Sequence, residues 1–159
     1  PGNSGGPLVN IEGQVIGMNT AVAGSAQNIG FAIPINEVKA AIASVKDKGT
    51  IERAYLGVQF VMLTDTFATR NNLPIKEGAL LRGDSQTLAV LSNSPAAKAG
   101  LQEGDIITRV GDADINTKKT LQSALTGYKP GDTVKVTYYR GNDKKTADVK
   151  LEAAPQATN

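Results

Sequence analysis

The alternation of apolar and polar residues divides the chain into two parts. In the first part, three short apolar runs separated by turn-forming residues predict three antiparallel strands. The runs are Pro7–Val9, Gln14–Met18 and Ile29–Ile33, and the segments between them include Glu12–Gly13 and Gly24–Gln27. A helix is predicted next, because apolar residues recur every three or four positions between a cap and a stop. Its stripe, cap and stop are Val38, Ala41, Ile42 and Val45, then Asn36, then Gly49.

From residue 55 onward the pattern predicts a second, β-rich part. The expected order is strand 55–63, loop, strand 79–91, short helix, strand 105–110, helix 118–126 and a final hairpin. Capping residues support both helices: Ser94, Pro95 and Gly100 for the first, Thr117 and Gly127 for the second. The hairpin joins 133–139 to 147–151 around Gly141–Asp143. We therefore expect domains at 1–50 and 55–152, a linker at 51–54 and a frayed polar tail at 153–159.

Composition places the chain among globular proteins. It has 159 residues, 40% of them hydrophobic and 20% charged, with a net charge of +2. The sequence pI of about 8.9 does not indicate a nucleic-acid partner, because the lysines are scattered and aromatic residues make up only 4%. No apolar run is long enough to cross a membrane, and the sequence contains no signal peptide. Because it begins at Pro1 rather than at a methionine, we expect the true N-terminus to lie upstream. The absence of cysteine excludes disulfides and thiol catalysis, and no pattern calls for a metal or a cofactor.

The first chemical motif is a serine in a glycine-rich loop directly before a strand. Ser4 lies within Pro1–Leu8, and glycines at positions 2, 5 and 6 permit a tight loop. Serine hydrolysis needs such a loop, because backbone N–H groups beside the serine oxygen stabilise the oxyanion of the tetrahedral intermediate. A glycine-serine segment of this length is also found in ordinary turns.

The second motif is Tyr55–Val58, which resembles the carboxylate-binding loop of PDZ domains and comes just before a predicted strand. A peptide's terminal carboxylate needs several N–H donors in a concave nest, and Gly57 would let the backbone turn them inward. By this resemblance, a peptide would add a strand beside 58–61, with the helix at 118–126 as the opposite wall. In a different interpretation, Gly57 marks a bulge in a core strand.

These motifs, with their neighbours, resemble HtrA-type serine proteases over nearly the whole chain. The resembling segments are Pro1–Leu8, Gly17–Ala21, Asn28–Pro34, Tyr55–Val58, Ser94–Leu101, Glu103–Ile107 and Lys129–Val134. The resemblance implies a mainly β fold with some α: the C-terminal part of a trypsin-like β-barrel, then a PDZ domain. The PDZ domain would be a five- to six-stranded, partly open barrel with two helices.

The resemblance also implies roles for individual residues. Ser4 would be the nucleophile, and the N–H groups of Gly2 and Ser4, on either side of the Asn3 peptide, would form the oxyanion hole. The substrate cleft would be formed by Asn19, Thr20, Ala21, Gly30, Phe31 and Ala32. The peptide groove of the PDZ domain would be formed by Tyr55, Leu56, Gly57, Val58, Phe60, Leu121, Ala124 and Leu125. Leu121 and Leu125 also fit a helix stripe that only packs on the core.

The chain contains no histidine. A serine hydroxyl needs a base to remove its proton, and in trypsin-like enzymes a histidine and an aspartate precede the serine in the sequence. We therefore expect both to lie upstream of Pro1, and we expect the isolated chain not to hydrolyse casein. A lysine base is disfavoured, because Lys39, Lys46 and Lys48 fall on the polar face or at the end of the predicted helix.

Two interpretations of the whole remain at this stage. The first is an extracytoplasmic bacterial quality-control endopeptidase that acts on unfolded or misfolded proteins. By the same resemblance, its PDZ domain would bind free apolar C-termini, and the whole protein would form homo-oligomers, as trimers. The second is a non-catalytic PDZ adaptor attached to a remnant protease domain. A histidine followed by an aspartate upstream would distinguish them. Residues 82–88 interrupt a segment that is continuous in the family, and we interpret them as a longer strand connection or a small hairpin. Arg82–Asp84 within them is too short a motif to indicate adhesion.

Overall fold

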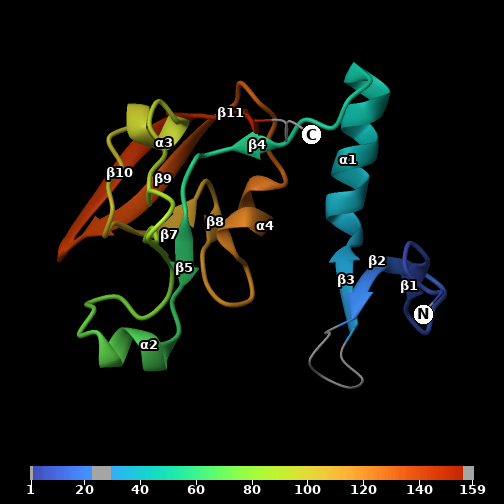
Figure 1. Ribbon diagram of the computed structural model, residues 1–159, viewed down its shortest axis with the longest axis horizontal. Helices are drawn as coiled ribbons and strands as arrows, with labels where there is room; N and C mark the ends of the chain where they lie inside the picture. Colours follow the sequence, from blue (N-terminus) through green and yellow to red (C-terminus); the bar gives the residue numbers. More distant parts are fainter. Residues whose placement is uncertain (1, 23–29, 156–159) are drawn as a thin grey trace. The chain divides into compact units, whose positions relative to one another are not determined.

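The computed structural model describes residues 2–22 and 30–155, and the chain divides into two compact units, Pro1–Ile51 and Glu52–Asn159. Ile29, the Gly24–Gln27 separator and the end of the expected tail, 156–159, lie outside the described residues. The fold is mainly β, and its sheets are open rather than closed into a barrel (Figure 1).

The first unit is a three-stranded antiparallel sheet followed by one helix. Its elements are β1 (Pro7–Val9), β2 (Val15–Val22), β3 (Gly30–Pro34) and α1 (Ile35–Lys48). The three predicted strands are confirmed, as is the stop at Gly49, whose φ is 75° and whose N–H donates to the Val45 carbonyl. The expected cap at Asn36 is wrong: β3 runs directly into α1, so Pro34 occupies the cap position and no side chain caps the helix.

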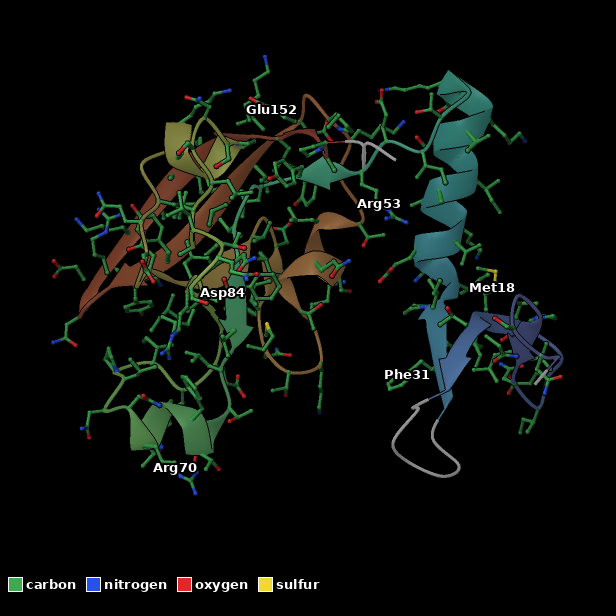
Figure 2. The ribbon with its side chains drawn as sticks, viewed as in Figure 1. Met18, Phe31, Arg53, Arg70, Asp84 and Glu152 are labelled. Atoms are coloured by element: carbon green, nitrogen blue, oxygen red, sulfur yellow. The ribbon has the colours of Figure 1, made fainter. Side chains whose placement is uncertain are left out.

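Among the described residues of the first unit, several large apolar side chains are exposed to solvent. No residue of α1 is buried, and Ile42 is 55% exposed. Val9 on β1 is 52% exposed and Phe31 on β3 is 56% exposed. Figure 2 shows the Phe31 side chain projecting away from its strand.

The second unit is built on a sheet whose strands follow the order β10-β9-β7-β6-β5, with β8 paired to β7. Its strands are β5 (Phe60–Met62), β6 (Ala79–Leu81), β7 (Ile106–Val110), β8 (Ala113–Asp114), β9 (Thr133–Arg140) and β10 (Asp143–Lys150). Its helices are α2 (Asp65–Arg70), α3 (Pro95–Lys98) and α4 (Leu121–Leu125). A separate two-stranded sheet pairs β4 (Ala54–Tyr55) with β11 (Glu152–Ala153).

Each face of this sheet carries its own apolar cluster. The larger cluster includes Val136 and Tyr138 of β9 together with Leu121 and Ala124 of α4. The smaller one, on the opposite face, joins Leu63, Leu80 and Ile106 and is covered by residues of α2 and the segment after it. Alternate residues of β9 therefore face α4 on one side and the α2 segment on the other.

Several predicted boundaries in the second unit are wrong. The expected strand 55–63 is interrupted by residues 56–59. Within the expected segment 79–91 the strand ends at Leu81, where the connection 82–88 begins. In the loop that follows, the Asp84 carboxylate accepts hydrogen bonds from the N–H groups of Gln86 and Thr87. The Asp84 side chain therefore fixes its own turn rather than extending the strand.

The helices of the second unit also differ in part from the expectation. Ser94 caps α3, as predicted, by accepting from the Ala97 N–H at 3.2 Å, and Gly100 has the expected positive φ of 78°. Thr120, not Thr117, caps α4, because the Asn116 side chain holds residues 117–119 in a turn. Helix α2, where a loop was expected, is a third helix.

The first and last strands of the second unit pair at Ala54 and Ala153, which lie within the expected linker 51–54 and the expected tail 153–159. The hairpin β9–β10 is confirmed, with Arg140 opposite Asp143 and Gly141 at a φ of 60° in the turn.

Candidate functional sites

The Ser4 loop is fastened to β2 by backbone hydrogen bonds. The Gly5 N–H donates to the Asn19 carbonyl at 2.7 Å, and the Asn19 N–H donates to the Gly6 carbonyl at 2.9 Å. The Gly6 N–H closes a turn onto the Asn3 carbonyl at 3.0 Å. Gly5 has a φ of 83°, a conformation that side chains disfavour. These bonds hold Ser4 at the exposed tip of a short turn.

The Ser4 hydroxyl donates a hydrogen bond to the Thr20 carbonyl at 2.7 Å. This carbonyl is available because β2 and β3 pair irregularly: Asn19 lies opposite Ala32 and Ala21 opposite Phe31, so Thr20 has no partner of its own. Such a bulge turns backbone groups out of the regular ladder. The bulge therefore orients the serine, but a carbonyl is not a base that could activate it.

The backbone N–H groups of Gly2 and Ser4 make no hydrogen bond within the part of the chain that the structure describes. Gly2 has a φ of 105°, which a residue with a side chain rarely adopts. Both donors are thus available for an oxyanion, although this role for Gly2, Asn3 and Ser4 stays a prediction.

The residues expected to form the substrate cleft lie on two paired strands. Asn19, Thr20 and Ala21 belong to β2, and Gly30, Phe31 and Ala32 belong to β3. The structure brings Asn19 and Thr20 directly to the Ser4 loop through the hydrogen bonds above. Their contacts with a substrate stay a prediction.

The loop Leu56–Val58 presents its N–H groups, whereas the carbonyls of Leu56 and Gly57 are bonded within the domain. The Leu56 carbonyl accepts from the Ala96 N–H at 2.9 Å, and the Gly57 carbonyl accepts from the Leu91 N–H at 3.0 Å. The N–H groups of Leu56, Gly57 and Val58 bond to no backbone or side-chain acceptor among the described residues. Three consecutive unpaired donors are what a carboxylate needs.

Gly57 could not be replaced without strain. Its φ is 80°, and a Cβ at this position would overlap the Ser94 Cβ and lie 3.2 Å from a ring carbon of Tyr55. Ser94 thus does two things: it caps α3 and it lies against the loop. The sequence indicated only the cap, and the contact with Gly57 could not have been found from sequence spacing.

Strand β5 has one free edge. The Arg82 N–H donates to the Gln59 carbonyl and the Leu63 N–H to the Gly78 carbonyl, so residues 59, 61 and 63 direct their polar groups toward β6. In an antiparallel pair the residues between them point the other way. The N–H and C=O groups of Phe60 and Met62 therefore face outward, continuing the row begun by Val58, which forms a single bridge to Val90. An extended peptide could pair with this row.

Helix α4 contributes mostly to the core. Leu121 is 1% exposed and Ala124 is 6% exposed, and both belong to the larger apolar cluster, while Leu125 is half-buried against it. The packing role that we considered for Leu121 is thus observed. A contact of Leu121, Ala124 or Leu125 with a bound peptide stays a prediction.

Within the described residues, no group of histidine, cysteine, aspartate or glutamate side chains is arranged to hold a metal ion. None of the helices described is long and apolar enough to cross a membrane.

Two protein families match this chain. The PDZ domain family matches residues 54–151, which is more than half of the chain, and the trypsin family matches residues 1–42. The two matches coincide with the unit that carries the Leu56–Val58 loop and the unit that carries Ser4.

Individual proteins match along nearly the whole chain. A serine protease Do-like HtrA of Lactococcus lactis is 44% identical over 158 residues, which cover 95% of this chain and 38% of that protein. A Bartonella henselae protein named "Probable periplasmic serine endoprotease DegP-like" is 33% identical, over 99% of this chain and 31% of its own length. The solved structure of the HtrA-type protease AlgW with a decapeptide aligns with a TM-score of 0.70 at 30% identity, over 98% of this chain and 47% of its own. The chain thus spans about two fifths of its Lactococcus relative.

Proposed function

Because the chain belongs to the HtrA-type serine proteases and carries a trypsin-like segment and one PDZ domain, we propose that the whole protein is a serine endopeptidase. Its substrates would be unfolded or misfolded proteins, and its nucleophile would be Ser4. The observation that carries this proposal is the Ser4 loop, a short glycine-rich segment that contains both an exposed hydroxyl and two backbone N–H groups unpaired among the described residues. A tetrahedral oxyanion requires that combination.

The chemistry needs more than this chain supplies. A histidine must take the Ser4 proton and an aspartate must orient the histidine, and the chain contains no histidine. The Ser4 hydroxyl would then leave the Thr20 carbonyl and donate to the histidine instead. The proposed role of Asn19, Thr20 and Ala21 is to pair with the substrate backbone, while Gly30, Phe31 and Ala32 line the pocket for the residue before the cleaved bond.

The 159-residue chain alone should not hydrolyse casein. Without a base, the Ser4 proton is held by a backbone carbonyl, and the hydroxyl is a weak nucleophile. Fluorescein-labelled casein incubated with the chain should release fluorescence no faster than with its Ser4→Ala variant. The whole protein should release it readily. Cleavage by the chain that disappears in the Ser4→Ala variant would mean that a base within these residues had been overlooked.

A second candidate function, that of a non-catalytic peptide adaptor, is favoured by one observation. The N–H groups of Leu56–Val58 and the free edge of β5 belong to the same compact unit, and neither depends on a catalytic base. The sequence upstream decides between the candidates. A histidine followed by an aspartate would support the protease, and their absence would support the adaptor.

In both cases the proposed task of the PDZ domain is to capture peptides with free, apolar C-termini. The terminal carboxylate would accept hydrogen bonds from the N–H groups of Leu56, Gly57 and Val58. The peptide backbone would pair with Val58 and Phe60 at the free edge of β5. Tyr55, Leu121, Ala124 and Leu125 would surround its last side chain.

Peptide titrations test this capture. A peptide ending in a free apolar residue should bind the chain at least about tenfold more tightly than the same peptide with an amidated end, because amidation removes the charged acceptor. Gly57→Ala should weaken binding of the free peptide by at least about tenfold, because the new Cβ forces the loop away from Ser94.

The matched control for Gly57→Ala is Gly100→Ala. Gly100 has nearly the same φ, 78° against 80°, but a Cβ there meets nothing within 4 Å. That variant should lose about 1–2 kcal/mol of stability from backbone strain and keep its affinity for the peptide. Equal binding of free and amidated peptides would rule out carboxylate capture.

A cellular location is proposed from the name of one relative, and an assembly from the resemblance to HtrA-type proteases. The printed name of the Bartonella henselae relative places that protein in the periplasm, and an extracytoplasmic location is accordingly proposed for this one. A homotrimer is the proposed assembly of the whole protein. Light scattering on the whole protein would test it by giving the number of subunits.

A further inference from the structure

The second unit has a polar hollow on the side of its sheet that faces away from α4. The hollow measures about 390 Å³ and lies between β8, β7, β9 and the start of β10, with Ile75 at its side. Its polar lining consists of Thr108, Arg109, Asp114, Thr137, Tyr139 and Lys144. Thr137 and Tyr139 alternate along β9 with the core residues Val136 and Tyr138. The hollow therefore opens on the face of the sheet opposite to the larger apolar cluster, to which Leu56 belongs.

A bulge in β7 shapes this hollow. Ile107 lies opposite Tyr138 and Arg109 opposite Thr137, so Thr108 is an extra residue on β7. In a regular strand, consecutive side chains point to opposite faces. Here both Thr108 and Arg109 line the hollow. Bulges of this kind often re-aim side chains beside functional sites.

The lining offers more hydrogen-bond donors than acceptors. The Arg109 Nε donates to Asp114 Oδ1 at 2.7 Å, and this bond raises the pKa of Arg109 and lowers that of Asp114, so both stay charged. The terminal Nη groups of Arg109, the Lys144 ammonium and the Tyr139 hydroxyl have no partner among the described residues. Asp114 is the only carboxylate of the lining, and it is engaged. The ligand that satisfies such a site is rich in acceptors and anionic.

The two cations lie on either side of β9. Lys144 on β10 pairs with Tyr139, and Arg109 on β7 pairs with Thr137. Two strand spacings amount to roughly 10 Å between their backbones, and both side chains reach into the same hollow. One small anion would leave one cation unused. Two carboxylates on alternate residues of an extended peptide are about 7 Å apart at the backbone, a separation that flexible side chains can adjust.

We propose that this hollow is a second peptide site, which binds an extended acidic segment through two carboxylates, one on Arg109 and one on Lys144. It lies outside the groove proposed for C-terminal peptides and does not depend on capture at Gly57. The two sites also bind different peptides, because the hollow selects acidic side chains within a peptide, whereas the groove selects a free apolar C-terminus. A substrate could thus be held at two points of one domain.

The test uses the full 159-residue chain and a fluorescent peptide of glycine and serine with glutamates at two alternate positions. The peptide is acetylated and amidated, so it has no terminal carboxylate for the Leu56–Val58 loop. It should bind, and the version with glutamines should bind at least about tenfold more weakly, because hydrogen bonds to charged groups are worth that much. Lys144→Gln should weaken binding by roughly fivefold to tenfold.

Lys145→Gln is the matched control. Lys145 is the next residue on β10, is also exposed, carries the same charge and pairs with Tyr138 on the other face. The Lys145→Gln variant should bind the peptide as tightly as the unmodified chain does, whereas the Tyr139→Phe variant should bind it more weakly. Amide NMR shifts on adding the peptide should fall on Thr108, Thr137 and Lys144.

Three outcomes would overturn the proposal. Equal losses in Lys144→Gln and Lys145→Gln would show unspecific attraction to a basic strand. Shifts at Val58 and Phe60 in place of Thr108 and Thr137 would place the peptide at the free edge of β5. Succinate that competes at the peptide's own concentration would show a small-anion site rather than a peptide site.

Discussion

Replacing Ser4 by alanine should reduce hydrolysis of casein by the whole protein by at least about ten-thousand-fold, since the nucleophile of a serine protease has no substitute. The loss should appear in the turnover rate and leave the fold intact. Ser4 is exposed, and its hydroxyl makes a single hydrogen bond, to the Thr20 carbonyl at 2.7 Å. Thermal unfolding of the variant should therefore match that of the unmodified protein.

Ser44→Ala gives a matched comparison. The Ser44 side chain, partly exposed on α1 of the first unit, also donates to a backbone carbonyl, that of Thr50, at 2.8 Å. Its replacement should leave activity unchanged. If Ser4→Ala retained substantial activity while Ser44→Ala behaved normally, Ser4 would not be the nucleophile and the proposed endopeptidase would lose its central residue.

Replacing Arg140 by methionine should lower the free energy of unfolding of the second unit by about 3 kcal/mol or more, the cost of leaving a buried charge without its partner. The Arg140 Nε and Nη2 donate to the two oxygens of Asp105 at 2.8 Å each, and Nη2 also donates to the Gly100 carbonyl. The Asp105 side chain is 1% exposed. Its carboxylate raises the pKa of Arg140, mainly through the hydrogen bond, so the guanidinium stays charged.

Urea unfolding followed by circular dichroism measures this loss, with Arg109→Met as the control. Arg109 also pairs with an aspartate on the same sheet, but its side chain is 51% exposed and that of Asp114 is 65% exposed. Exposed pairs contribute little to stability, so Arg109→Met should lose much less than Arg140→Met. If both variants lost the same free energy of unfolding, the burial of Asp105 would not explain the contribution of the Arg140–Asp105 pair to stability.

Local chemistry explains which parts of the fold could be predicted. The three strands of the first unit and the hairpin β9–β10 follow from short apolar runs and turn residues close together in the sequence. Ser94, Pro95 and Gly100 define α3 because a cap, a first helical residue and a stop act over a few positions. Each of these signals is complete within one short segment of chain.

The errors arose where two local signals competed. Thr117 and Thr120 are both acceptable caps, and only the Asn116 turn, whose side chain accepts from the N–H groups of residues 118 and 119, decides for Thr120. Helix α2 carried a cap signal too, since the Thr64 side chain accepts from the Phe67 N–H. Its short length left it without the periodic stripe by which longer helices are recognised.

The candidate sites divide in the same way. The sequence identifies Ser4 and Gly57 because their glycine-rich surroundings are contiguous. It does not show that a bulge at Thr20 supplies the acceptor for Ser4, or that Ser94 lies against Gly57. Both features depend on residues brought together from distant positions. The hollow beside Arg109 was missed for this reason as well, since β7, β8, β9 and β10 each contribute to it.

The pairing of β4 with β11 has a mechanical consequence. The Ala154 N–H donates to the Arg53 carbonyl, and the next pairs inward are Ala153 with Ala54 and Glu152 with Tyr55. The chain therefore enters and leaves the second unit side by side. Tension applied to the two ends, as by a substrate being pulled or a neighbouring segment moving, would peel this ribbon apart one bond at a time. Under such tension the β4–β11 pair would separate before the core of the second unit unfolds.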